Sequence, residues 1–76
     1  MPTGEYERIR SVVADASPEQ PLTAREVLDL LEEHDSDVAE EVGSPHHIAT
    51  VLGRRARHGD VEVLDGDPYR YRLVDD

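Results

Sequence analysis

Arginine and histidine side chains concentrate in the C-terminal half of this chain. Five of the eight arginines and three of the four histidines lie between residues 46 and 72, and the chain has no lysine. A guanidinium group presents a planar fork of N–H donors that fits phosphate oxygens and the guanine edge in the major groove. The sequence therefore predicts a surface for an anionic partner, with double-stranded DNA as the first candidate. The candidate binding residues are His46, His47, Thr50, Arg54, Arg57, Arg70 and Arg72.

Other chemistry finds little support in the residue types. The serines lie in no nucleophile elbow, and the chain has no glycine-rich phosphate loop. There is no cysteine, and none of the four histidines forms a His-x-x-x-His pair, so a zinc site would need carboxylates or a second subunit. We therefore expect no enzyme activity, no metal and no cofactor.

Charge is distributed unevenly along the sequence. The chain has 18 acidic and 8 basic residues and a formal net charge of −10. Residues 1–43 carry −9, whereas residues 44–72 carry +1, so an anionic partner is expected to approach the second half. The composition resembles that of proteins from extreme halophiles. Carboxylates hold water and cations well, and molar salt reduces the Debye length to about 3 Å, so the acidic residues repel one another little there. An acidic partner-binding protein is the other interpretation.

Length and hydropathy indicate one small domain. The 76 residues leave room for a single modest core, which we place at about residues 4–74. No apolar run approaches the ~20 residues of a membrane span, and the first residues lack the pattern of a signal peptide. We expect a cytoplasmic protein.

Capping signals mark the first helices. The spacing of apolar residues predicts a helix from about Gly4 to Ala16, with Thr3 as its N-cap. Thr23 and Glu26 form a Thr-x-x-Glu capping box at the start of a helix over residues 24–34. Residues 35–43 are either a short turn of helix carrying two valines or an irregular acidic loop.

The last predicted helix carries most of the candidate binding residues. Ser44 is a good N-cap and Gly59 a good terminator, so the helix is expected over residues 45–58. One arc of its helical wheel is apolar, and the other is polar and basic. The predicted helix contains no acidic residue. Arg54 and Arg57 either contact DNA or pair with the acidic first half. Arg55 falls inside the apolar arc and is expected to pair with a carboxylate or to extend its head to water.

The end of the chain changes from helical to alternating periodicity. Residues 61–64 and 69–73 are predicted strands, joined by the turn at residues 65–68. Tyr69 and Tyr71 are expected in the core, whereas Arg70 and Arg72 share the opposite face. One of these arginines is expected either to pair with Glu62 across the strands or to contact phosphate. Residues around 20–22 could add a short third strand.

The order of three helices and a hairpin resembles the winged helix-turn-helix family. The similar segments are Thr23–Leu31, Ser44–Leu52 and Gly59–Val63, and the pattern looks like that of small winged-helix proteins of halophilic archaea. The resemblance covers residues 5–74 and implies an α+β fold whose last helix reads the major groove while the hairpin, or wing, contacts the DNA backbone or minor groove. Two features differ from the family pattern. About ten residues separate the helices of the motif, and the wing turn, with Asp65 and Asp67, is acidic.

These observations lead to two functional hypotheses. The first is a DNA-binding winged-helix module that acts as a small transcriptional regulator. The second is a winged helix that binds another protein and no DNA, because fold does not fix function. A homodimer formed through the acidic first helix or the hairpin is compatible with either hypothesis.

Overall fold

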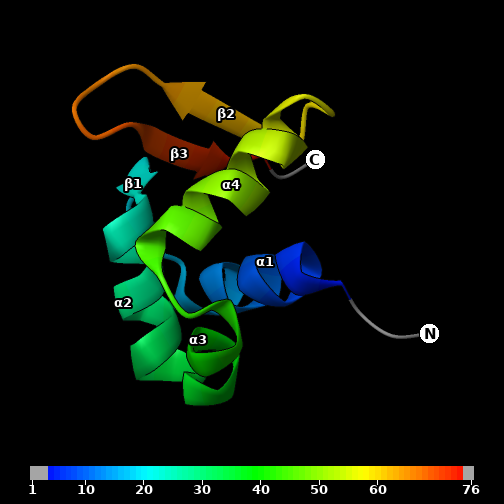
Figure 1. The fold of residues 1–76 in the computed structure, drawn as a ribbon, viewed down its shortest axis with the longest axis vertical. Helices are drawn as coiled ribbons and strands as arrows, with labels where there is room; N and C mark the ends of the chain where they lie inside the picture. Colours follow the sequence, from blue (N-terminus) through cyan, green and yellow to red (C-terminus); the bar gives the residue numbers. More distant parts are fainter. Residues whose placement is uncertain (1–3, 75–76) are drawn as a thin grey trace.

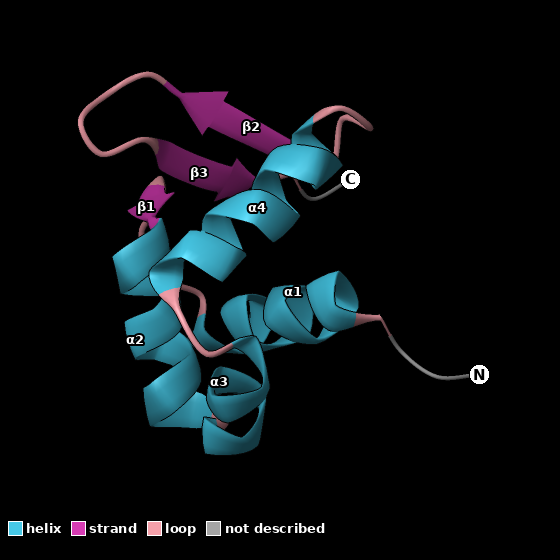
Figure 2. Ribbon diagram, in the orientation of Figure 1, coloured by secondary structure: helices cyan, strands magenta, loops and turns pink. Residues whose placement is uncertain are grey.

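Four helices and a three-stranded antiparallel sheet form an α+β fold with a winged-helix-like layout (Figure 1). The computed structural model describes residues 4–74. The sheet forms one side of the molecule, and the helices lie on the other side (Figure 2). None of the helices in the described range is long and apolar enough to cross a bilayer. The elements are α1 (Glu5–Ala16), β1 (Leu22–Thr23), α2 (Ala24–His34), α3 (Ser36–Val42), α4 (Pro45–Ala56), β2 (Val61–Leu64) and β3 (Arg70–Leu73).

Helix starts follow the capping signals of the sequence. At the start of α2 the Thr23 N–H donates to the Glu26 carboxylate at 2.8 Å, and the Glu26 N–H donates to the Thr23 hydroxyl at 3.1 Å. The capping box is therefore confirmed. The Ser44 hydroxyl likewise accepts from an N–H in the first turn of α4. At α1 the N-cap residue is Gly4, and the expected cap Thr3 lies outside the described residues.

Residues 35–43 contain a short helix, α3, with Asp35 and Gly43 as its cap residues, and are not an irregular loop. The Asp35 side chain accepts from the Val38 N–H at 3.4 Å, which caps the first turn of α3. Val38 and Val42 are both buried, so burial of the apolar side stabilises this short acidic element. Gly43 ends it with a φ of +85°, a conformation that favours glycine. The connection between α2 and α4 is thus a helix in place of a tight turn.

The last helix ends two residues earlier than expected. The structure ends α4 at Ala56, whereas the sequence suggested His58. The Gly59 N–H reaches the Ala56 carbonyl at 3.2 Å, and Gly59 has a φ of +82°. The chain therefore leaves the helix through a tightened last turn, with glycine in the position predicted for it.

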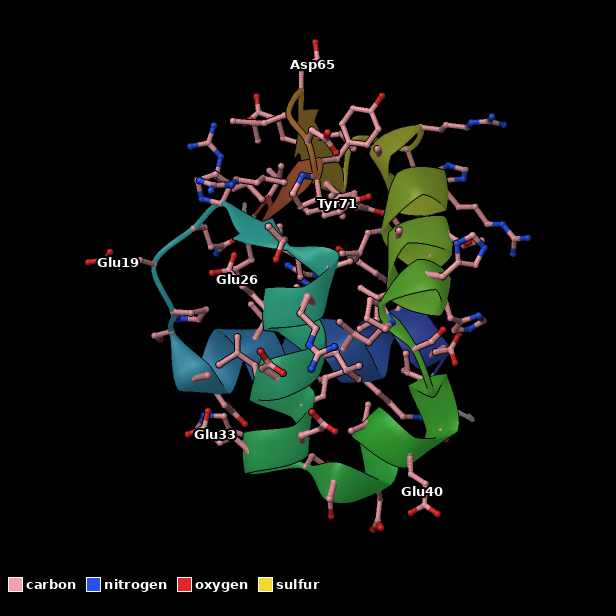
Figure 3. All side chains as sticks on the ribbon, turned by 60° about the vertical axis from the view of Figure 1, so that its left-hand side comes forward. Glu19, Glu26, Glu33, Glu40, Asp65 and Tyr71 are labelled. Carbon is pink, nitrogen blue, oxygen red and sulfur yellow. The ribbon has the colours of Figure 1, made fainter. Side chains whose placement is uncertain are left out.

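The core is built from aliphatic side chains and two tyrosines, which come from every helix and from the sheet. Ile48 and Leu52, on the inner side of α4, are fully buried, and so are residues from α1 and α2. No polar or charged residue in the described range is buried. Labelled carboxylates such as Glu19, Glu33 and Glu40 point away from the body of the molecule (Figure 3). Hydrophobic burial is therefore the main stabilising term. The fully buried side chains are Ile9, Val27, Leu31, Ile48 and Leu52.

Strand order in the sheet is β1-β3-β2, with β1 as the expected third strand. In β3, Tyr71 and Leu73 are buried, and the two arginines between and before them are exposed, as alternation predicts. The placement of Tyr69 in the core was wrong, because 54% of this side chain is exposed. Strand β3 begins at Arg70, so Tyr69 lies in the connection at the outer end of the hairpin.

Truncating the core side of α4 should destabilise the domain. Leu52→Ala removes a fully buried side chain and is expected to lower the free energy of unfolding by about 2–5 kcal/mol. Thr50→Ala, on the exposed side of the same helix, is the matched control and should change it by less than about 0.5 kcal/mol. Chemical denaturation measures both. Equal effects of the two substitutions would show that the inner side of α4 is misassigned.

Alkaline pH should destabilise the domain through its buried tyrosines. Burial, with a smaller contribution from Tyr69, raises the pKa of Tyr71 above the ordinary tyrosine value of about 10. The unfolded chain then loses this proton first, so the stabilisation is complete below the unfolded pKa and is lost as the pH rises through the folded pKa. We expect Tyr71→Phe to lose less stability than the wild type between pH 9 and pH 11 in thermal melts. Parallel pH profiles would contradict this expectation.

Candidate nucleic-acid interface

Four of the predicted binding residues form a line along the outer side of α4 and its C-cap residue, Arg57. His46, Thr50, Arg54 and Arg57 are all exposed and follow one another at intervals of three or four residues. This spacing keeps them on one side of a helix over roughly 16 Å, at about 1.5 Å per residue. We call these four residues the α4 stripe.

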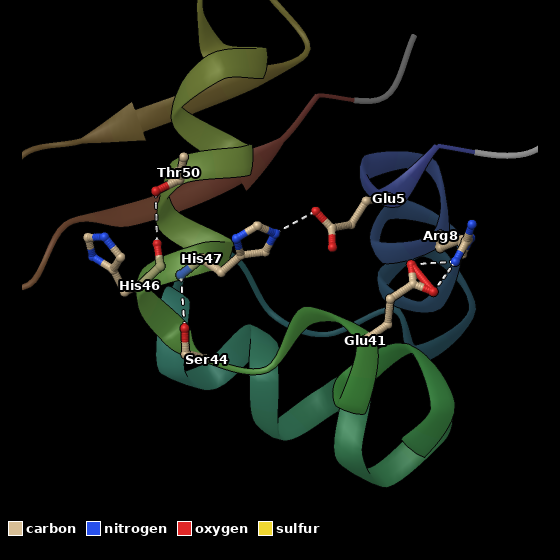
Figure 4. A network of polar contacts seen from close by, with 7 residues as sticks. All are labelled: Glu5, Arg8, Glu41, Ser44, His46, His47 and Thr50. Atoms are coloured by element: carbon tan, nitrogen blue, oxygen red, sulfur yellow. Dashed lines mark hydrogen bonds and ion pairs between the residues drawn. The ribbon is translucent and has the colours of Figure 1, made fainter.

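The two guanidinium groups of the α4 stripe are not used by the rest of the fold. Arg54 and Arg57 have no carboxylate within 4 Å among residues 4–74. The sequence left open whether these arginines pair with the acidic first half, and they do not. The Thr50 hydroxyl donates to the His46 carbonyl at 3.1 Å, so this side chain is held against its own helix (Figure 4). Two cations that are unpaired within residues 4–74 therefore project from α4 and its C-cap residue, a segment that contains no acidic residue.

His47 does not belong to the α4 stripe, although the sequence placed it there. Its Nε2 lies 2.6 Å from the Glu5 carboxylate of α1. Figure 4 shows the His47 ring turned toward Glu5, whereas the ring of His46 points away from α1. The His47 side chain thus connects α4 to α1. A position on the polar arc of the helical wheel could not reveal a partner 42 residues away.

Arg55 forms a second connection between α4 and α1. Its guanidinium lies 4.7 Å from the centre of the Tyr6 ring and 3.3 Å from the Glu7 carboxylate. It also reaches Asp60 at 3.5 Å, just after the helix. The expectation that Arg55 pairs with a carboxylate is confirmed. The carboxylates that contact α4 are therefore held by His47 and Arg55, on a different side of the helix from the stripe.

The hairpin arginines are not brought together with the α4 stripe. Arg72 pairs with Glu62 across the two strands, with its Nε 2.9 Å from the carboxylate, which was the structural role expected for one of the two. Arg70 has no carboxylate within 4 Å among the described residues. Both arginines lie on the face of the sheet opposite Tyr71, and the Tyr71 face packs on the helices. This face is therefore separate from the α4 stripe.

A shallow groove borders the α4 stripe on the side of the hairpin. Its volume is about 540 Å³, and it lies between the N-terminal ends of α2 and α4 and the outer end of the hairpin. Pro45 and Ala49 of α4 form one wall, and Pro68 and Tyr69 form another. The sequence did not point to Tyr69 as a surface residue. The neighbouring turn residues Asp67 and Pro68 could have indicated its exposure, because they place Tyr69 next to the turn, at the end of the predicted strand.

Histidines and carboxylates do not gather into a metal centre in the part of the chain that the structure describes. No group of three or more such side chains in residues 4–74 could hold a metal ion. His46 and His47 point to different sides of α4, and His47 already contacts Glu5 (Figure 4). No family model, curated protein or solved structure matches this chain, so its function has to be inferred from the geometry of its surface.

Two neighbouring arginines should separate structural from exposed roles. Arg55→Ala removes a ring contact and two ion pairs between elements and is expected to lower the free energy of unfolding by about 1–2 kcal/mol. Arg54→Ala removes the same charge from the exposed side and should leave stability within about 0.5 kcal/mol of the wild type. Thermal and urea unfolding measure the difference. A larger loss for Arg54→Ala would mean that the α4 stripe is structural.

Proposed function

We propose that this domain binds double-stranded DNA with α4 lying in the major groove, as a small transcriptional regulator. The observation that carries the proposal is the α4 stripe, because Arg54 and Arg57 are exposed, unpaired among the described residues and free of acidic neighbours on their own helix. The major groove is about 12 Å wide and admits an α-helix. The resemblance of the fold to winged helices supports the same docking mode.

The order of residues along the α4 stripe suits this orientation. In helix-turn-helix complexes the N-terminal residues of the recognition helix contact base edges. His46 and Thr50 occupy that part of α4, and both carry hydrogen-bonding groups suited to base edges or phosphates. Arg54 and Arg57 follow on later turns and would reach guanine or backbone phosphate. The stripe thus offers one or two direct base contacts and two charged contacts.

The charge distribution favours one approach to DNA. The acidic side chains of α2 and α3, such as Glu33 and Glu40, lie at the end of the molecule away from the hairpin (Figure 3). Phosphate repels these surfaces, so the α4 stripe is the side on which a duplex meets least opposition. The net charge of −10 causes long-range repulsion between the protein and the phosphate backbone in dilute buffer. In molar salt this repulsion is largely screened, which fits the halophile-like composition.

One observation favours the alternative, a winged helix that binds a protein. Val63 and Tyr69, two large hydrophobic side chains of the hairpin, are 40% and 54% exposed, and the DNA-binding mode makes no use of them. Aromatic residues of this kind are enriched at protein interfaces. The turn between them carries Asp65 and Asp67, which repel phosphate.

Single-arginine variants test the DNA-binding proposal. Arg54→Ala and Arg57→Ala should each weaken binding to a mixed-sequence duplex by about 1–3 kcal/mol, which is roughly 5- to 150-fold in Kd. Where the lost contact is to phosphate, the slope of log K against log salt should fall by about 0.9. Arg10→Ala removes one positive charge from α1, outside α4 and the hairpin, and is the charge-matched control. Fluorescence anisotropy over a KCl series measures all three.

Amide chemical-shift mapping with the same duplex locates the surface. Shifts confined to residues 45–57 support docking through α4. Shifts restricted to the outer hairpin, or binding that Arg10→Ala weakens as much as Arg54→Ala, would replace the proposed mode with a non-specific one. Absence of any shift at millimolar duplex would exclude DNA as the partner.

A further inference from the structure

Strand β2 leaves one edge of the sheet open. The strand order β1-β3-β2 makes β2 an outer strand, and among residues 4–74 it pairs with β3 alone. Figure 2 shows β2 at the outer margin of the molecule, on the side of the sheet away from β1. Val63, in this strand, is 40% exposed. An open edge presents unpaired N–H and C=O groups that can pair with another strand.

The hydrogen-bond pattern identifies the residues whose main-chain groups face this open edge. The Val74 N–H donates to the Asp60 carbonyl at 2.9 Å, so these two residues form a hydrogen-bonded pair. In an antiparallel ladder, hydrogen-bonded pairs alternate with pairs that are not hydrogen-bonded. The next hydrogen-bonded pairs are therefore 62/72 and 64/70. The Leu73 N–H agrees, because it turns away from β2 and donates to the Gln20 side chain at 2.8 Å. The main-chain groups of Val61 and Val63 therefore point outward.

This edge lacks the usual protection against pairing. Natural edge strands carry lysine, proline or a bulge that blocks a second strand. The four residues of β2 include none of these, and their register with β3 is continuous. The one charged side chain, Glu62, is paired with Arg72 of the same hairpin. Charge on β2 itself therefore offers little resistance to another strand.

We propose that a second copy of this chain pairs with this edge, β2 against β2 in antiparallel orientation, about a two-fold axis through Val63. In this register the N–H and C=O groups of the two Val63 residues bond to each other. Glu62 then faces Leu64 of the second copy, so no like charges lie directly opposite each other. The exposed Val63 side chains of the two copies meet at the axis. The strand is thus complementary to itself, as an isologous interface requires.

The dimer places both copies of α4 on one side of a continuous six-stranded sheet. The two-fold axis of an antiparallel strand pair is normal to the sheet, so the helices of both copies pack on the same face. If the proposed function holds, the two α4 stripes would contact two half-sites of one duplex. Pairing through β2 does not itself require DNA.

Salt should affect dimerisation and DNA binding in opposite directions. Each copy carries a formal charge of −10, so the two copies repel each other in dilute buffer. Screening removes this repulsion, and dimerisation should increase with KCl concentration. DNA binding weakens with salt because counterions are released from the duplex. Dimerisation and DNA binding can therefore be measured separately, and failure of one proposal can be distinguished from failure of the other.

A single cysteine tests the register directly, because the natural chain has none. The Cα atoms of a hydrogen-bonded antiparallel pair are about 5.5 Å apart, which is within the range of about 4.4–6.8 Å for a disulfide. Val63→Cys should form a disulfide-linked dimer at about 2 M KCl at least tenfold faster than Val74→Cys. Val74 is the control because it is similarly exposed but lies beyond β3, away from the free edge. Equal rates would overturn the proposed register.

Sedimentation measurements test the dimer without a cross-link. Wild-type protein at millimolar concentration should shift from monomer toward dimer as KCl rises. Val63→Pro removes the outward N–H and spares the bonds to β3, so it should remain folded and monomeric. Val63→Thr keeps both the N–H and the shape of the side chain and should still dimerise. A wild type that stays monomeric, or a folded Val63→Pro that dimerises as the wild type does, would rule the interface out.

Discussion

Burial of the inner side of α4 is the constraint on which the candidate surface depends. Ile48 and Leu52 are fully buried, and they fix the rotation of the helix about its own axis. Once that rotation is set, the 3.6-residue period determines which side chains face outward. Arg54 and Arg57 are exposed for this reason, and His47 and Arg55 face α1 for the same reason. The packing of α4 and the exposure of the candidate surface are therefore two results of one helix orientation.

The features that could be predicted from the sequence are those with local causes. The capping box of Thr23 and Glu26 involves neighbours in the chain, and so does the cap at Ser44. Alternation in β3 follows from strand geometry and separates buried from exposed residues correctly from Arg70 to Leu73. The pairing of Arg72 with Glu62 follows from the register of a hairpin. In each case the interacting groups are close in sequence or related by a simple period.

The features that could not be predicted depend on where distant elements pack. The contact between His47 and Glu5 requires the position of α1 relative to α4, which no periodicity in either helix contains. Whether residues 35–43 form a helix depended on a surface against which Val38 and Val42 could be buried. The exposure of Tyr69 depends on where β3 begins, because this residue lies one position before the strand. The exposed side of α4 could thus be predicted from the period of one helix, whereas the partner of His47 and the exposure of Tyr69 could not.

The absence of buried charged side chains among the described residues determines how the fold responds to its ionic surroundings. The connections between α1 and α4 through Glu5 and Glu7 are partly exposed, and dissolved ions weaken such contacts. The interior contains no charged side chain among the described residues for those ions to screen. A concentrated electrolyte should therefore loosen the outer polar contacts and leave the interior unchanged. The two helices would then be held together almost entirely by their hydrocarbon contacts.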